Sequence, residues 1–266
     1  MRLKPSPVKE RALEARVDLL EPLRATDADL HRRLEELAPD VATVVAYGKI
    51  LPASLLEIPE RGFINVHFSL LPAYRGPAPV QRALMDGVAE TGVSVMVLSE
   101  GMDEGPVLAS RRVTVTERDN VSTLGERLAR VGADLLVPSL RGYVGGFLEP
   151  VPQDDSQATY APKVSTEEAR IDWTAGAREI TNLARALDPE PGAWTTLRGE
   201  RVKVYSARPA PGVPRLGPGE IAGPPGLVVG TGDVALEILE AQVAGRRRMA
   251  GADLARGLRA SGERFE

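Results

Sequence analysis

The stretch GFINVHFSLLPAYRGPAPVQRALMDG, residues 62–87, contains one complete unit of an α/β fold. Its first part, GFINVHF (62–68), is a short apolar run with the β-branched residues Ile64 and Val66, which is typical of a strand. A proline-containing loop follows, and APVQRALMDG (78–87) is a helix candidate. A strand that leads through a loop into a helix is the repeating unit of α/β sheets. This stretch therefore predicts an α/β protein.

Similar segments lie on both sides of this unit. Further strand candidates are DVATVVAYG (40–48), GVSVMVLS (92–99) and VLASRRVTVT (107–116), and TDADLHRRLEELA (26–38) is a further helix candidate. Strands that alternate with helices predict βαβ units, so we expect a mostly parallel sheet.

A longer helix is expected over residues 123–143. Thr123 and Glu126 have the spacing of a capping box at its start. Its apolar face is formed by Leu124, Leu128, Val131 and Leu135. We expect this helix to close a first domain over residues 1–144.

The composition changes after that helix. Residues 145–162 are rich in proline, glycine and polar side chains, as in a domain linker. Beyond them, one short helix at 174–187 is followed by short strand candidates around a loop rich in proline and glycine. This pattern predicts a second, C-terminal domain over residues 163–266 that is a small β-barrel or sandwich.

The overall composition is that of a globular protein. The 266 residues are 43% hydrophobic and 26% charged, and no apolar run is long enough to span a membrane. The absence of cysteine excludes disulfides and thiolate catalysis, and fits a reducing cytoplasm. The net charge is −5 over residues 1–160 and +1 over residues 161–266, so any nucleic-acid binding has to rest on local basic patches.

A candidate catalytic group lies at the end of the strand quoted first. Asn65 and His67 are two residues apart and so share one face of that strand. In open α/β sheets ligands bind beyond the carboxyl ends of the strands. An amide donor beside an imidazole suits the stabilisation of an oxyanion next to a proton transfer. Asp103, in a turn flanked by glycines after the next strand, is a candidate partner for the imidazole.

Ordinary structural roles remain open for these residues. A single histidine at a strand end is commonly a structural residue, and an aspartate between glycines is by default a turn former. His31, among charged residues on its helix, is expected to be a surface residue.

Several motifs resemble one enzyme family. AYGKILP (46–52), INVHFSLLPAYRGPAPVQRAL (64–84), ETGVSVMVL (90–98) and GMDEGPVLA (101–109) occur in the order found in the formyltransferases that use 10-formyltetrahydrofolate. The resemblance extends into the second half through KVSTEEARIDW (163–173) and VKVYSA (202–207). It is closest to the branch of the family whose second substrate is methionyl initiator tRNA.

The resemblance implies a Rossmann-like formyltransferase domain followed by an OB-like β-barrel that binds tRNA. It implies that Asn65, His67 and Asp103 are catalytic, with Asn65 and His67 at the formyl oxygen and Asp103 orienting His67. It further implies that 10-formyltetrahydrofolate is the co-substrate, that no metal is needed and that the protein is a cytoplasmic monomer. The folate site implied by the resemblance comprises Ser69, Leu70, Leu71, Pro72, Tyr47 and Gly48.

Two alternatives remain at this point. The acceptor of the formyl group could be a small molecule, either glycinamide ribonucleotide or an amino sugar, or the chain could be an inactive fragment that only binds RNA or folate. The family pattern begins with a strand, a loop, a helix and a second strand that we expect to be missing here, which would leave this chain with little activity. In the second domain, Arg246, Arg247 and Arg248 are expected to contact tRNA phosphates.

Overall fold

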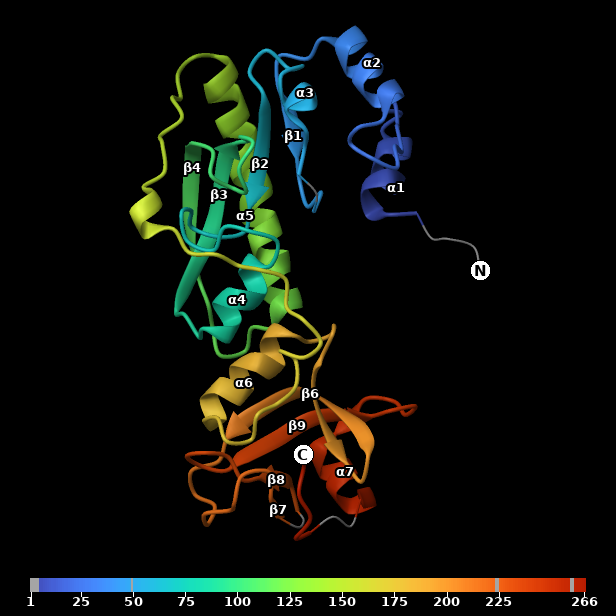
Figure 1. Ribbon diagram of the computed structural model, residues 1–266, viewed down its shortest axis with the longest axis vertical. Helices are drawn as coiled ribbons and strands as arrows, with labels where there is room; N and C mark the ends of the chain where they lie inside the picture. Colours follow the sequence, from blue (N-terminus) through green and yellow to red (C-terminus); the bar gives the residue numbers. More distant parts are fainter. Residues whose placement is uncertain (1–4, 49, 223–224, 259–260) are drawn as a thin grey trace.

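The computed structural model describes residues 5–48, 50–222, 225–258 and 261–266, which form two sheets stacked along one long axis (Figure 1). The elements before the second sheet are α1 (Pro7–Glu14), α2 (Ala28–Leu37), β1 (Ala42–Val44), α3 (Ala53–Leu56), β2 (Phe63–His67), α4 (Pro79–Met85), β3 (Glu90–Val97), β4 (Val107–Thr114), α5 (Val121–Val144) and η1 (Asp155–Gln157). The predicted strands and helices of this half are confirmed. No helix within the described ranges is both long and apolar enough to cross a membrane.

The first sheet has the strand order β1-β2-β3-β4. Its only parallel pair among the described residues is β1 with β2, whereas β2 with β3 and β3 with β4 are antiparallel. The prediction of a mostly parallel sheet is therefore wrong. The reason is α4, which has 7 residues, or about 10 Å. It packs on α6 (Ala177–Ala186) of the second half and does not return along the sheet. The chain therefore enters β3 at the end of the sheet where it leaves β2, so the two strands are antiparallel.

One face of this sheet is covered by α5, which runs behind β2, β3 and β4 in Figure 1. The predicted apolar face is confirmed, since Leu124, Leu128 and Leu135 are buried and Val131 packs against the same core. Gly132 allows the close approach, because a Cβ there would lie 2.7 Å from Cγ1 of Val66.

The start of α5 differs from the prediction. The helix begins at Val121, and the capping box is formed by Asn120 and Thr123, whose side-chain oxygens each accept from the backbone N–H of the other residue. Thr123 is thus the third helical residue and not the cap, because Asn120 has the extended backbone that a cap needs.

The second sheet is antiparallel and curls into a half-barrel, as the predicted OB-like β-barrel requires. Its strands follow the order β5-β6-β9-β8-β7, with β10 paired to β9. Residues 262–266 bridge its two edges, since Glu266 pairs with Thr196 of β5 and Glu263 accepts from Ile221 of β7. The remaining elements are β5 (Ala193–Leu197), β6 (Glu200–Pro209), β7 (Ile221–Ala222), β8 (Leu227–Val229), β9 (Leu236–Val243), β10 (Met249–Ala250) and α7 (Gly251–Leu258).

The segment between the two sheets is packed against the first one. Residues 159–161 pair with residues 75–78 through three backbone hydrogen bonds, in which Arg75 donates to Thr159, Ala161 donates to Arg75 and Ala78 donates to Ala161. Arg82 of α4 then holds Glu168 and the carbonyls of Pro162 and Lys163. The predicted limits of domains and linker stay a prediction, but this segment is an ordered part of the first half.

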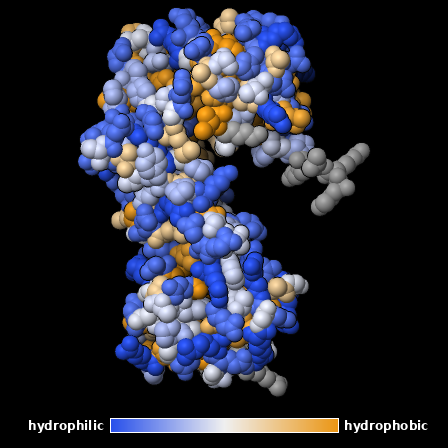
Figure 2. Space-filling view, in the orientation of Figure 1, coloured by the Kyte–Doolittle hydropathy of each residue, from blue (hydrophilic) through white to orange (hydrophobic). Residues whose placement is uncertain are grey.

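The N-terminal helices lie beside β1 and contribute little to the core. Neither α1 nor α2 buries a residue, and the space-filling view shows a mostly hydrophilic face with small hydrophobic patches (Figure 2). His31 keeps part of its surface exposed on α2, and its Nε2 lies 2.9 Å from the carbonyl oxygen of Ala25. It is therefore a surface residue, as predicted, with one backbone contact.

Candidate active site

Strand β2 presents two polar side chains at its carboxyl end. Ile64 and Val66 point to the core under α5, so the alternation of the strand places Asn65 and His67 on the opposite face. Asn65 is half-buried, and its side chain has no hydrogen-bond partner among the described residues. His67 is buried, with 5% of its surface exposed. The predicted pair therefore shares one face, with a free amide next to a fixed ring.

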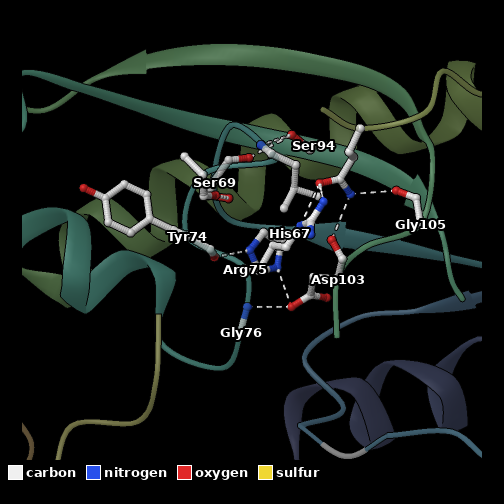
Figure 3. Close-up of polar contacts among 11 residues, drawn as sticks. His67, Ser69, Tyr74, Arg75, Gly76, Ser94, Asp103 and Gly105 are labelled. Atoms are coloured by element: carbon white, nitrogen blue, oxygen red, sulfur yellow. Dashed lines mark hydrogen bonds and ion pairs between the residues drawn. The ribbon is translucent and has the colours of Figure 1, made fainter. Parts of the chain in front are cut away.

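The His67 ring lies between a carbonyl and a carboxylate (Figure 3). Its Nε2 is 2.8 Å from the backbone oxygen of Tyr74, which only accepts, so the tautomer with the proton on Nε2 fits this contact. Its Nδ1 is 3.6 Å from Oδ2 of Asp103. That separation is longer than a hydrogen bond of about 3.2 Å. The Nδ1 atom thus has a charged neighbour and makes no hydrogen bond within the described residues.

Asp103 comes from the loop between β3 and β4. Its Oδ2 accepts a hydrogen bond of 2.8 Å from the backbone N–H of Gly76, on the loop that follows β2. Its backbone has φ of +55°, the left-handed region, which aspartate tolerates better than most residues. The structure therefore brings Asn65, His67 and Asp103 to one edge of the sheet, as the sequence predicted.

The predicted folate-site residues directly follow β2. Ser69 donates to the carbonyl of Ala73 over 2.6 Å, and its own carbonyl accepts from Ser94 of β3. The Ser94 hydroxyl also accepts from the backbone N–H of Leu71, which precedes Pro72. The side chain of Leu70 lies against Gly92 of β3, where a side chain would collide with it. These contacts fix the loop on β3 next to the catalytic face.

Tyr47 and Gly48 follow β1. Because β1 and β2 are parallel, both strands end at the same edge of the sheet, and these two exposed residues lie at the edge that carries Asn65 and His67. Gly48 has φ of +68°, so the chain turns sharply there. Their backbone groups are accessible at this edge, as a ligand-binding turn requires. Lys49 of the same motif lies outside the described residues.

Arg75 was not predicted as a site residue, and only 2% of its surface is exposed. Its guanidinium donates to the side-chain oxygen of Gln153 over 3.0 and 2.9 Å and to Asp155 over 2.7 Å. Burial disfavours the charge, but the hydrogen bond and ion pair with Asp155 outweigh burial and raise the pKa of Arg75. In the sequence, the only feature that could have marked Arg75 as a site residue was its position between a proline-containing loop and a glycine.

Tyr74 lies on the far side of the same loop and has a positive φ of +59°. Burial, and next the hydrogen bond to Asp86, raises the pKa of its hydroxyl well above the ordinary value. The ring lines a hollow of about 470 Å³ together with Arg82, Asp86 and Tyr160. This hollow adjoins the loop but does not contain the three predicted catalytic residues.

Metal-ligating side chains are scattered over the part of the chain that the structure describes. No three His, Cys, Asp or Glu side chains there lie close enough together to hold an ion. The chemical groups of the site are an amide, an imidazole, a carboxylate and backbone N–H groups, which suit charge stabilisation and proton transfer.

Comparisons with known proteins agree with the motifs. A family model described as "Formyl transferase" matches residues 2–140, and one described as "Formyl transferase, C-terminal domain" matches residues 163–259. Methionyl-tRNA formyltransferase of Streptomyces coelicolor is 48% identical over 265 residues, which are 99% of this chain and 86% of that protein. Methionyl-tRNA formyltransferase of Thermobifida fusca is 44% identical over 266 residues, with 99% of this chain and 86% of that protein covered.

Solved structures show the same fold. A crystal structure of HypX from Aquifex aeolicus in complex with tetrahydrofolic acid has a TM-score of 0.68 and 23% identity, covering 88% of this chain and 42% of that one. The sugar 3N-formyl transferase WlaRD, crystallised in the presence of dTDP and 5-N-formyl-THF, has a TM-score of 0.67 and 15% identity, covering 90% and 82%. The fold and the close relatives agree, and the chain belongs to the formyltransferase family, in its methionyl-tRNA formyltransferase branch.

Proposed function

We propose that this protein transfers the formyl group of 10-formyltetrahydrofolate to the amino group of methionyl initiator tRNA, as a one-carbon transferase of translation initiation. The supporting observation is the grouping of Asn65, His67 and Asp103 at the carboxyl edge of β1 and β2, in a chain whose relatives at 40% to 48% identity are methionyl-tRNA formyltransferases. A translation enzyme without cysteine fits the cytoplasm.

The site has the groups that the folate co-substrate requires. The unpartnered amide of Asn65 fits the formyl oxygen, and the fixed loop of Ser69, Leu70, Leu71 and Pro72 offers an apolar wall for a flat ring. The exposed turn at Tyr47 and Gly48 offers backbone groups for the polar edge of the ring. When bound, 10-formyltetrahydrofolate supplies the carbon that the methionine amine attacks.

Each catalytic side chain then has one role. Asn65 donates to the formyl oxygen, where negative charge develops as the amine adds. With the proton on Nε2 held by Tyr74, Nδ1 of His67 accepts the proton that the amine loses and passes it to the nitrogen of the departing tetrahydrofolate. Asp103 faces the ring and stabilises its transient positive charge. A new C–N bond forms and the old one breaks, so the atoms balance.

The direct test uses purified protein, 10-formyltetrahydrofolate and a panel of acceptors. Methionyl initiator tRNA is expected to be formylated, whereas glycinamide ribonucleotide and a dTDP amino sugar are not. The sugar enzyme among the neighbours shares only the fold with this chain, at 15% identity. Formylation of a small acceptor in place of the tRNA would contradict the proposal.

Replacing Asn65 by Ala is expected to lower the rate of transfer by about 10²-fold, because one donor to the developing oxyanion is lost. The substitution breaks no hydrogen bond among the described residues, so the thermal unfolding midpoint should stay close to that of the parent. Single-turnover kinetics at saturating folate measures the loss. A rate within a few-fold of the parent would contradict the role of Asn65.

The three arginines predicted to contact tRNA phosphates, Arg246, Arg247 and Arg248, differ in their surroundings. Arg248 is held by Asp188 and Glu240 at 2.7 and 2.6 Å and stacks over the ring of Tyr205. Burial opposes its charge, but the two carboxylates raise its pKa. The side chains of Arg246 and Arg247 are exposed and have no partner within the described ranges. The phosphate contact expected of Arg248 stays a prediction that would compete with these ion pairs, and Arg246 and Arg247 are the candidates with no competing partner among the described residues.

Replacing Arg246 and Arg247 together by Ala is expected to weaken tRNA binding and flatten its salt dependence. Two lost phosphate contacts correspond to about 0.7 to 0.9 each in the slope of log K against log salt concentration. Binding titrations at several salt concentrations measure the slope. Arg256→Ala is the control, since Arg256 is exposed on α7 and paired with Asp253. An unchanged slope in the double variant would make the two residues an ordinary solvated turn.

A further inference from the structure

We propose that Gln153, in the segment between the two sheets, is a positioning residue that holds the two catalytic loops together; this rests on the proposed function. Its Nε2 donates to the backbone oxygens of Asp103 and Gly105 over 2.8 and 2.7 Å. Its Oε1 accepts from the Nε and Nη2 atoms of Arg75 over 3.0 and 2.9 Å. All four hydrogen-bonding positions of one amide are thus used on two loops.

The two loops carry the parts of the proposed site. The loop after β2 contains Tyr74, whose carbonyl holds His67, and Gly76, whose N–H holds the carboxylate of Asp103. The loop after β3 carries Asp103 itself. Gln153 closes a ring of contacts. The ring runs from Arg75 along the chain to Gly76, from Gly76 to the carboxylate of Asp103, and from the Asp103 carbonyl back to Gln153. Arg75, Gly76 and Asp103 are labelled in Figure 3.

Asp103 needs such support because its backbone is in the left-handed region, with φ of +55°. That conformation costs free energy for a residue with a side chain and persists only where neighbouring groups fix it. The Gln153 amide binds the carbonyl of Asp103 and that of Gly105, a glycine packed so closely against Val97 that no side chain fits. The carboxylate is thereby aimed at Gly76 and at the His67 ring.

The chemistry of an amide explains why glutamine fits this position. The two carbonyls require donors, and the buried guanidinium of Arg75 requires an acceptor. Glutamate would satisfy Arg75 but would set a charged oxygen against two carbonyl oxygens. Methionine has a similar length and satisfies neither side. The two substitutions therefore separate the donor half of the amide from its acceptor half.

The experiment compares Gln153→Glu and Gln153→Met with the parent in the full chain. Gln157→Glu is the matched control, because Gln157 lies in the same segment, is exposed, and its side chain hydrogen-bonds only to Ser156 among the described residues. Both Gln153 variants are expected to lose about 10- to 100-fold in kcat, as small misplacements of catalytic groups do. The KM values for folate and tRNA should change less than about threefold, because neither substrate contacts Gln153 in the proposed site.

A further readout distinguishes positioning from a general loss of folding. Hydrogen exchange of the Gly76 amide should accelerate in both variants, while that of Leu128 in α5 stays slow.

The outcomes are distinct. If the parent fails to formylate methionyl initiator tRNA, the proposed function fails, and exchange at Gly76 still tests the link between the loops. If the parent is active and both variants keep its kcat, or Gly76 exchange does not change, Gln153 does not position the site. A loss of kcat matched by an equal loss of folded protein in thermal unfolding would also overturn the proposal.

Discussion

Replacing His67 by Asn is expected to lower formyl transfer by about 10³-fold, because the variant loses the group that moves the amine proton. The amide of asparagine is too short to replace the contact of Nε2 with the Tyr74 carbonyl, but the backbone hydrogen bonds of Arg75 and Ala78 with residues 159 and 161 should still hold the loop after β2. The KM for each substrate should change little, since the ring acts on the reacting atoms. Single-turnover measurements with bound folate and methionyl initiator tRNA report the chemical step directly.

The other histidine supplies the control for this experiment. His31 also places Nε2 at hydrogen-bond distance from a backbone carbonyl, that of Ala25, but it lies on α2, outside the site. His31→Asn makes the same chemical change in a similar hydrogen-bonding environment and should leave turnover within about twofold of the parent. A His67→Asn variant that transfers formyl within a few-fold of the parent would exclude the proposed proton transfer.

The catalytic face could be predicted because it depends on local geometry. Period-two alternation alone places Asn65 and His67 together, and the buried Ile64 and Val66 fix which face they occupy. Asp103 is different: its position in a turn after the next strand made it a candidate, but nothing in that turn indicates a contact with a distant histidine, and only the resemblance implied a catalytic role. The predicted site residues still await kinetic tests, although the structure brings the three together.

Three features could not be predicted from the sequence, and they share a physical cause: each depends on partners that are distant in the sequence. Gln153 bonds to residues 50 and 78 positions away, and no local pattern marks a glutamine that bridges two loops. Arg248 is one of three consecutive arginines and differs from its neighbours through its ion pairs with Glu240 and with Asp188, which is 60 residues away. The direction of β3 is set by α4, which packs on α6 of the second half. The periodicity of α4 does not reveal that partner.

Local competition explains the remaining miss, at the start of α5. Thr123 and Glu126 match the capping-box spacing, but Asn120 three residues earlier matches an N-cap as well. Asparagine is the stronger cap, so the helix begins one turn earlier than the pattern of Thr123 and Glu126 indicates.

Replacing Asp103 by Asn is expected to lower transfer by about 10²- to 10³-fold without loss of folding, because the charge opposite the His67 ring is removed while the shape is kept. The amide oxygen of the variant can still accept from the N–H of Gly76, and the backbone bond to Gln153 is untouched. Asp134→Asn is the control, since Asp134 is exposed on α5 and its side chain has no hydrogen bond or ion pair among the described residues.

A double-variant comparison tests whether Asp103 acts through His67. The carboxylate lies 3.6 Å from Nδ1 and accepts from Gly76, and neither contact reaches the acceptor substrate in the proposed arrangement. If orienting and stabilising the ring is its whole contribution, Asp103→Asn should cost nothing further once His67 is already Asn, because groups that act as a unit are not additive. Full additivity of the two losses would mean that Asp103 contacts the reacting atoms itself, and the division of roles proposed for this site would have to be replaced.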